Sequence, residues 1–177
     1  MRACHVLISI ALAVLPTVAA AQTEPLATAE LHDRDGRQVG KVTFRQTAGN
    51  GVLITASFVA GGLPPGPHAF HVHEKGTCAP NFEAAGEHFD PEGHQHGALA
   101  AQGAHAGDLP NLHLPERGEH VVEMMAARLS LQPRAPGNLL DEDGSAVVVH
   151  AKPDDYKSQP SGEAGDRIAC GVVRRAS

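Results

Sequence analysis

The stretch that indicates the fold most directly is Ala69-Phe70-His71-Val72-His73, which follows the chain break Pro64-Pro65-Gly66-Pro67. A short apolar run after turn residues is typical of a β-strand. Side chains of a strand alternate between two faces, so the imidazoles of His71 and His73 point the same way. That spacing can place two nitrogen ligands on one metal ion. The pattern also arises by chance, so it indicates a metal site only together with further ligands.

More strand-like runs lie on both sides of this stretch, at residues 26–32, 38–46, 51–59, 105–114, 120–128, 145–150 and 168–173. The pairs Asp35-Gly36 and Asn50-Gly51 are hairpin signals, which favour antiparallel pairing. We find no amphipathic helix of useful length. Seven or eight short strands separated by turns predict a β-sandwich or barrel.

Two long polar segments interrupt the strands, one from Glu74 to about Gly103 and one from Ala151 to Asp166. Structureless loops longer than about 15 residues are usually functional in a compact domain. Histidine is concentrated in this part of the chain, because eight of the 12 histidines lie within residues 68–113. The composition therefore points to a metal.

Length and charge exclude several classes of protein. The 177 residues fit a single domain. Lys and Arg number 14 and Asp and Glu number 20, giving a net charge of −6, which argues against a protein held mainly by nucleic-acid phosphates. With no Trp, one Tyr and five Phe, the chain lacks the aromatic platforms on which single strands stack. We expect no nucleic-acid partner.

Residues 1–21 are predicted to be a secretory signal peptide, which leaves residues 22–177 as the mature domain. Arg2 precedes a nearly continuous apolar run at residues 6–15, and Ala19-Ala20-Ala21 offers a cleavage site before Gln22. The apolar run is too short for a spanning helix, although a retained membrane anchor is the alternative. We expect no membrane span in the mature chain. Cleavage removes Arg2 and no acid, so the net charge becomes 13 − 20 = −7.

Removal of the leader also takes away Cys4 and leaves Cys78 and Cys170. In an oxidising compartment each of these has only the other as an intramolecular partner, so we expect a disulfide. A soft metal site that uses both thiols is the alternative, but neither cysteine has the close Cys or His neighbour that is typical of such sites.

The remaining donors complete two sets of metal ligands. His88 and His96 lie in the first long loop, His105 and Asp108 follow near its end, and His150 ends an apolar run. Three histidines and one carboxylate form a reasonable tetrahedral zinc shell. The other nitrogens, closer to an all-imidazole set, suit copper.

Six motifs follow one another along the chain: residues 66–73 (GPHAFHVH), 86–91 (GEHFDP), 96–97 (HG), 105–109 (HAGDL), 148–150 (VVH) and 165–172 (GDRIACGV). In this order and spacing, the chain resembles the copper/zinc superoxide dismutases over nearly all of residues 26–173. Residues 154–160 (DDYKSQP) are similar to the periplasmic bacterial branch. The resemblance implies an all-β fold, an eight-stranded antiparallel Greek-key β-barrel or sandwich with two long functional loops.

The resemblance also implies a function and a site. The function is dismutation of superoxide to oxygen and hydrogen peroxide by alternating reduction and oxidation of copper, and the cofactors are copper and zinc. The implied site comprises copper ligands His71, His73, His88 and His150, zinc ligands His88, His96, His105 and Asp108, the outer carboxylate Asp154, and the disulfide Cys78–Cys170. His88 is shared as an imidazolate that takes up and returns a proton, and Arg167 attracts the superoxide anion as the second catalytic residue.

Small departures and alternatives accompany this interpretation. Glu163 stands where the family usually has Asn or Gly, and Thr77 where Ser or Asp is commoner. These departures concern the shape of the loops and not the metal ligands.

A non-catalytic copper/zinc-binding protein on the same scaffold is the alternative function. A zinc hydrolase would need an open zinc position, which four protein ligands would close. The sequence leaves open whether the chain is a monomer or a homodimer.

Several residues near the motifs are assigned no role. His94 has no family counterpart, and a contact between its ring and the metal is left open. His32, His68, His113 and His120 are interpreted as surface or loop residues. Lys75 and Lys152 lie near the expected substrate channel, where they either steer the anion or are merely solvated.

Overall fold

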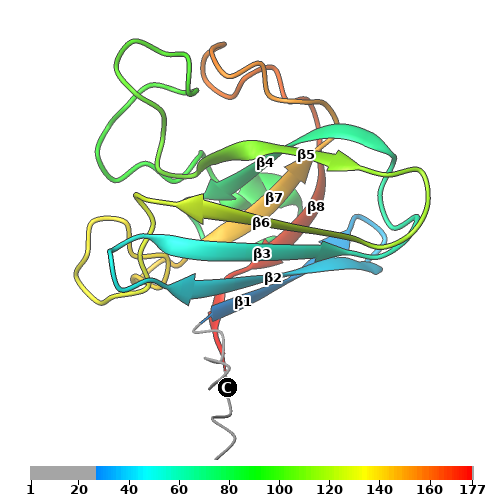
Figure 1. Cartoon of the computed structure of the whole chain (residues 1–177), viewed down its shortest axis with the longest axis horizontal. Helices are drawn as coiled ribbons and strands as arrows, with labels where there is room; N and C mark the ends of the chain where they lie inside the picture. The colour runs from blue at the N-terminus through cyan, green and yellow to red at the C-terminus, as the bar shows by residue number, and fades with distance from the viewer. Residues whose placement is uncertain (1–26, 177) are drawn as a thin grey trace, which may run out of the picture.

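The computed structural model describes residues 27–176, and nearly all of their regular structure is strand (Figure 1). In chain order the elements are β1 (Ala27–Asp33), β2 (Gln38–Gln46), β3 (Val52–Phe58), β4 (Gly66–His73), the 3₁₀ turn η1 (Phe82–Ala85), β5 (Asp108–Leu114), β6 (His120–Ala126), β7 (Ala146–His150), β8 (Arg167–Val172) and β9 (Arg174–Arg175). No helix in this part of the chain is long and apolar enough to span a membrane. The predicted signal peptide and Cys4 lie outside the described residues.

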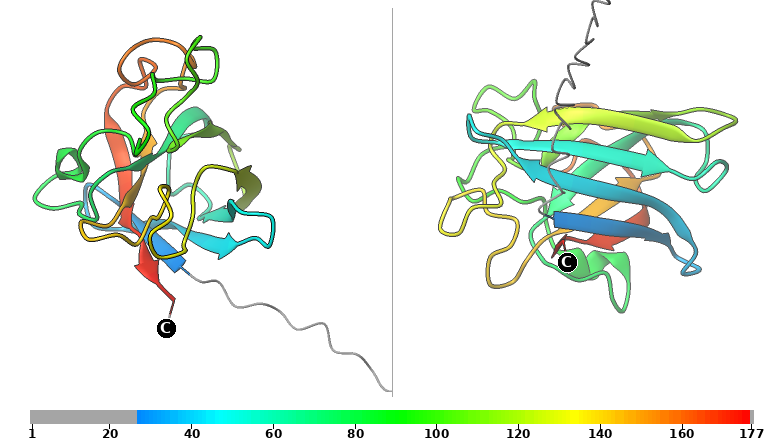
Figure 2. Two further views of the ribbon diagram at one scale, coloured as in Figure 1. Left: turned by 90° about the vertical axis from the view of Figure 1, so that its left-hand side faces the viewer. Right: turned by 60° about the horizontal axis from the view of Figure 1, so that its bottom comes forward.

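The strands form one antiparallel sheet that curls into a nearly closed barrel. Their order is β5-β4-β7-β8-β1-β2-β3-β6, with the short β9 paired to β1. The end strands β5 and β6 approach each other and nearly close the barrel. Strands β1, β2 and β3 follow one another as hairpins, whereas the chain crosses the barrel ends from β3 to β4 and from β6 to β7 (Figure 2). The predicted eight-stranded antiparallel Greek-key barrel is confirmed.

The hairpins form where the turn residues predict them. Gly36 has φ +79°, and Asn50 and Gly51 have φ +66° and +83°. Two consecutive positive φ values are what a tight turn between right-twisted strands requires, and Asn-Gly supplies them at little steric cost. The turn at Asn50 sets the register of β2 on β3, in which Phe44 lies opposite Ile54 inside the barrel.

Strands β4 and β7 are buried on both faces, and this places the site. Phe70 and Val72 point into the barrel core together with Val147 and Val149. Because the strand period is two, His71, His73 and His150 point to the opposite, outer face. These three side chains are buried as well. The two long loops lie next to each other on this side of the barrel (Figures 1 and 2).

Two strands begin three residues away from the predicted position, whereas the other boundaries agree within two residues. Strand β4 begins at Gly66 instead of Ala69, because Gly66 and Pro67 already pair with β5. Proline is tolerated there, at the start of a strand. Strand β5 begins at Asp108 instead of His105, because the Asp108 N–H donates to the His105 carbonyl at 3.2 Å and so closes a turn.

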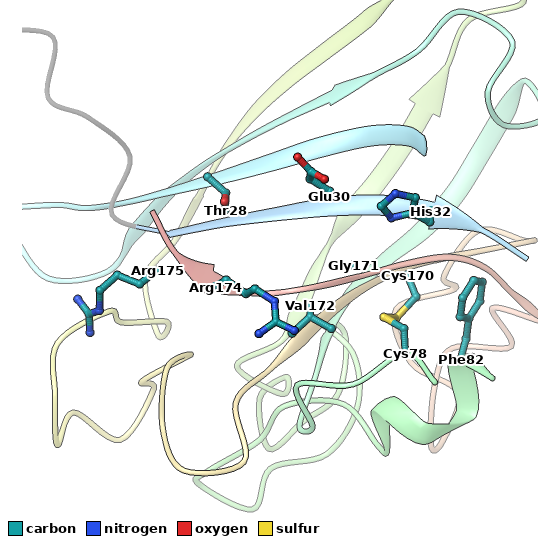
Figure 3. A pocket seen from close by; sticks show the side chains of 10 residues that line it. All are labelled: Thr28, Glu30, His32, Cys78, Phe82, Cys170, Gly171, Val172, Arg174 and Arg175. Atoms are coloured by element: carbon teal, nitrogen blue, oxygen red, sulfur yellow. A yellow bond between two sulfur atoms is a disulfide. The ribbon is translucent and has the colours of Figure 1, made fainter. Parts of the chain in front are cut away.

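The disulfide between Cys78 and Cys170 is confirmed, with the Cα atoms 6.0 Å apart. It ties the first long loop to β8, and both cysteines and Phe82 line a surface pocket together with residues of β1, β8 and β9 (Figure 3). The bond joins residues 92 positions apart. For a loop of that length, the chain-entropy model assigns about 4–5 kcal/mol of stabilisation.

Glu163, noted above as a departure from the family pattern, has φ +54° and an exposed side chain. This left-handed conformation is unfavourable for a residue with a long side chain and easier for Asn. We expect Glu163→Asn to raise the free energy of unfolding of the metal-free protein by about 0.5–1 kcal/mol. Urea unfolding measures it. The control is Glu142→Asn at an exposed loop position without positive φ; equal effects of the two substitutions would refute the explanation.

Candidate metal centre

Four imidazoles converge on the outer face of β4 and β7. His71 and His73 come from β4, His150 ends β7, and His88 comes from the first long loop. One ring nitrogen of each lies within 4.8 Å of those of the other three. All four residues are buried, with at most 6% of their surface exposed. We call this set the four-histidine cluster.

The main chain of β4 positions His88. The N–H of Phe89 donates to the Val72 carbonyl at 2.8 Å, and the N–H of Glu74 donates to the Glu87 carbonyl at 3.0 Å. Residues 87–89 therefore run beside the end of β4, and His88 forms an isolated β-bridge with His73. Backbone hydrogen bonds thus hold the one cluster member that lies outside a strand.

Each ring of the four-histidine cluster has one occupied and one bare nitrogen. The occupied nitrogens face an oxygen: His71 Nε2 lies 2.9 Å from Asp154 Oδ2, His73 Nδ1 2.9 Å from Gly86 O, His88 Nδ1 2.8 Å from Asp108 Oδ1, and His150 Nδ1 3.2 Å from Gly165 O. The bare ones, His71 Nδ1 and the Nε2 atoms of the other three, are buried without any hydrogen-bond partner. Such orphaned polar atoms are rare in native proteins, and four of them facing one another fit a metal ion that is bound by nitrogen.

A second set of donors lies on the other side of His88. His88, His96, His105 and Asp108 also bring one ligand atom each within 4.8 Å of the others. Asp108 Oδ1 lies 2.8 Å from His88 Nδ1, 3.1 Å from His96 Nδ1 and 3.2 Å from His105 Nδ1. The contact with His96 does not have the orientation of a hydrogen bond. We call this set the His-Asp cluster; its three nitrogens and one carboxylate oxygen fit zinc.

The two carboxylate oxygens of Asp108 contact different groups. Oδ2 accepts hydrogen bonds from the N–H groups of Gly97 at 2.8 Å and His105 at 2.9 Å. Oδ1 is left to face the three imidazoles. The main-chain donors thereby orient the carboxylate that completes the His-Asp cluster.

Asp154 connects the two clusters, and its side chain has no exposed surface. Oδ2 lies 2.9 Å from His71 Nε2, and Oδ1 lies 2.9 Å from His96 Nε2. Each ring can donate its N–H to the carboxylate and turn its other nitrogen inward. One carboxylate thus sets the tautomer of a member of each cluster.

Burial keeps three members of the four-histidine cluster, His73, His88 and His150, neutral. Burial, together with the nearby His88 ring, holds the pKa of His73 well below its ordinary value. Burial lowers the pKa of His88 to about 4 and, with the neighbouring His71 ring, that of His150 to about 3. Neutral rings have a lone pair to offer, so these residues are prepared to bind a cation at neutral pH.

The His-Asp cluster has a different charge balance. Burial opposes a charged ring at His96, but the carboxylates of Asp108 and Asp154 outweigh it and raise the pKa of His96 to about 9. Burial likewise opposes a charged Asp108, yet hydrogen bonds from His105, His88 and the Gly97 N–H hold the pKa of this carboxyl well below its usual range. A cation that binds here displaces a proton from His96 and meets an ionised carboxylate.

Arg167 lies beside the four-histidine cluster. Its Nη1 and Nη2 atoms donate to the carbonyls of Phe82 at 2.8 Å and Gly86 at 2.7 Å. The Gly86 carbonyl also faces His73 Nδ1. A shared carbonyl therefore joins the guanidinium to a member of the cluster, and the disulfide anchors the loop that supplies both carbonyls.

The other histidines lie outside both clusters. His94 faces Asp90, with 3.4 Å between Nδ1 and Oδ1. The interpretation of His68 as a surface or loop residue is wrong, because only 3% of its surface is exposed. Its ring nitrogens lie 2.8 Å from the His150 carbonyl and 2.9 Å from the Pro64 carbonyl. His68 lies in β4, which begins earlier than predicted, and its ring is enclosed between these two carbonyls.

Sequence reasoning missed Gly162. It has φ +69°, and a Cβ atom there would overlap Asp154 Oδ1 and lie 2.6 Å from His96 Nε2. The contact between Asp154 and His96 therefore needs a residue without a side chain at this position. No periodicity or spacing in the sequence indicates this, because the contact joins segments of two loops.

The chain is similar to known proteins over most of its length. A family model described as copper/zinc superoxide dismutase matches residues 38–173. A Cu-Zn superoxide dismutase from Aquifex aeolicus is 45% identical, over 84% of this chain and 86% of its own length. One from Caulobacter vibrioides is 44% identical, over 84% and 85%. The crystal structure of a double mutant of a SOD-like protein from Bacillus subtilis has a TM-score of 0.78 at 42% identity, and covers 82% of this chain and 95% of that one.

We expect Gly162→Ala to destabilise the metal-free protein more than the backbone conformation alone explains. The control is Gly36→Ala, at φ +79° with no atom within 4 Å of the added Cβ, so it carries the conformational cost without an overlap. The loss of unfolding free energy in urea should be about 1–3 kcal/mol larger for Gly162→Ala. Equal losses would show that the contact between Asp154 and His96 does not depend on Gly162.

Proposed function

Since this chain belongs to the copper/zinc superoxide dismutase family, we propose that His71, His73, His88 and His150 hold copper and that His88, His96, His105 and Asp108 hold zinc. The chain is an enzyme with copper and zinc as cofactors, and it converts two superoxide anions and two protons into oxygen and hydrogen peroxide. The observation that carries the residue assignment is the position of His88, which offers Nε2 to one cluster and Nδ1 to the other.

The donor atoms support this division of the metals. Four imidazole nitrogens suit copper, whereas three nitrogens and a carboxylate suit a closed zinc site. When bound, copper supplies the one-electron redox couple for the two half-reactions, and zinc supplies a fixed positive charge. The chain must then hold the ligands, deliver protons and bring in the anion.

We assign proton storage to Nε2 of His88. The atom is buried and has no hydrogen-bond partner in the described chain, and Nδ1 would be taken up by zinc in the loaded protein. A proton that the ring takes up between the two half-reactions would therefore reside at Nε2. From there it passes to the substrate that becomes peroxide, and solvent provides the second proton.

We assign attraction and docking of the anion to Arg167. A guanidinium has no lone pair for a metal, but it has a permanent charge and several donors. The side chain is 13% exposed, which leaves it within reach of solvent beside the copper ligands. A non-catalytic copper/zinc-binding protein on this scaffold would need the ligands but no such cation, so the position of Arg167 favours the enzyme.

We infer that the protein is exported to the periplasm after removal of residues 1–21. The sequence of that segment supports export. So does the disulfide, because such bonds form and persist in oxidising compartments. The intact mass of the mature protein from a bacterial host should correspond to a chain that begins at Gln22; a retained leader would contradict export with cleavage.

The direct test of the proposed function combines metal analysis with an assay on one purified sample. We expect equal amounts of copper and zinc, one of each per chain, and rapid conversion of superoxide into oxygen and peroxide in equal amounts. A protein that binds both metals but does not accelerate the decay of superoxide would instead be the non-catalytic alternative.

Arg167→Ala should leave the copper content unchanged and lower the rate with superoxide by about tenfold or more, because the local charge that attracts the anion is lost. Arg167→Lys should recover part of the rate, since the charge returns without the forked geometry. Arg175→Ala removes the same charge from β9 and serves as the control. Undiminished activity of fully copper-loaded Arg167→Ala at low ionic strength would disprove the assignment.

A further inference from the structure

Gln159, in the second long loop, binds the main chain of His96 from both sides. Its Oε1 atom accepts the His96 N–H at 2.9 Å, and its Nε2 atom donates to the His96 carbonyl at 2.9 Å. The same Nε2 group also donates to the Lys157 carbonyl at 3.0 Å, which keeps the amide in its own loop. The carboxamide thus pairs with a residue of the other loop as a neighbouring strand would.

His96 lies in a segment without regular secondary structure, where the N–H of the next residue, Gly97, donates to Asp108 Oδ2 at 2.8 Å. No strand or helix lies between η1 and β5 of the described chain. Within the described residues, no backbone hydrogen bond joins the N–H or the carbonyl of His96 to another main-chain group. Its two main-chain groups are bonded by Gln159, and its ring is bonded by Asp154 Oδ1 at 2.9 Å.

The second long loop, whose Asp154 and Gln159 contact His96, is itself bonded to the barrel. Asn111 of β5 accepts the Asp154 N–H at 2.8 Å and donates to the Asp154 carbonyl at 2.9 Å. Its own N–H donates to the Tyr156 hydroxyl at 2.9 Å. Asp154 and Gln159 therefore reach His96 from a segment whose position is set by the strand that begins with Asp108.

We infer that Gln159 is a positioning residue of the zinc site, one that fixes the main chain of His96 so that Nδ1 faces Asp108 and His88. This inference rests on the proposed function, in which His96 is a zinc ligand. Gln159 touches neither metal ligand atoms nor substrate; it acts by limiting the orientations of one ligand. Partners of this kind commonly change metal affinity by about 10–100-fold when they are lost.

A zinc-positioning role differs from general stabilisation in where the loss appears. The side chain of Gln159 is exposed, but its two hydrogen bonds to His96 are part-buried and His96 has no exposed surface, so their loss also costs the metal-free protein some stability. Zinc adds a stricter demand, because it needs four donors at fixed distances and a loosened His96 releases the ion more readily. The loaded protein should therefore lose more stability than the metal-free chain, and zinc release should become faster.

The test compares Gln159→Met with Gln102→Met. Methionine matches glutamine in length but cannot form the amide pair. Gln102 is exposed in the loop that carries His96, and its side chain makes no hydrogen bond to the described residues. We expect zinc transfer from the fully loaded protein to a chelating dye to be about 10–100-fold faster in Gln159→Met and unchanged in Gln102→Met. The visible spectrum of cobalt(II) at the zinc site should change only in Gln159→Met.

Three outcomes would overturn the inference. If Gln159→Met keeps zinc as long as the parent protein, Gln159 does not position His96. If the metal-free forms of the parent and Gln159→Met differ in melting temperature as strongly as the loaded forms do, the residue has a merely structural role. If the parent protein takes up no zinc at His96, the proposed function fails and the inference fails with it.

Discussion

The imidazole of His88 faces two sets of ligands at once, and the arrangement of the rest of the site follows from that constraint. Its Nε2 atom points at the bare nitrogens of His71, His73 and His150, while Nδ1 lies 2.8 Å from Asp108. Hydrogen bonds beside β4 hold residues 87–89, so the ring is fixed by the barrel although it belongs to a loop. The strand positions of His71 and His73 then place the first set, and the start of β5 places Asp108 of the second.

Charge is divided between the two sets by burial and by carboxylates. The four-histidine cluster is buried, and burial lowers the pKa of His88 to about 4 and that of His150 to about 3. The His-Asp cluster has two ionised carboxylates nearby, which raise the pKa of His96 to about 9. Asp154 contacts one histidine of each set at 2.9 Å and so couples their orientations. Arg167 provides a positive charge beside the four-histidine cluster and belongs to neither set of ligands.

The features that follow local rules could be predicted from the sequence. The period of two put His71 and His73 on one face, the Asn-Gly and Asp-Gly turns marked the first hairpins, and the cysteine count of the mature chain indicated the disulfide. The features that depend on contacts between loops could not. Gly162, Asn111 and Gln159 act on Asp154 and His96 through contacts that have no periodicity. His68 was misjudged because its enclosure depends on the early start of β4 and on the carbonyls of Pro64 and His150, neither of which its local sequence indicates.

In the proposed enzyme, His88 lies between two different metal ions. Anomalous diffraction at the copper and zinc absorption edges, from crystals of the fully loaded protein, locates each metal separately. We expect a copper peak next to the nitrogens of His71, His73, His88 and His150. We also expect a separate zinc peak next to His88, His96, His105 and Asp108. A single position occupied by both metals, or a copper or zinc peak that does not contact His88, would contradict this arrangement.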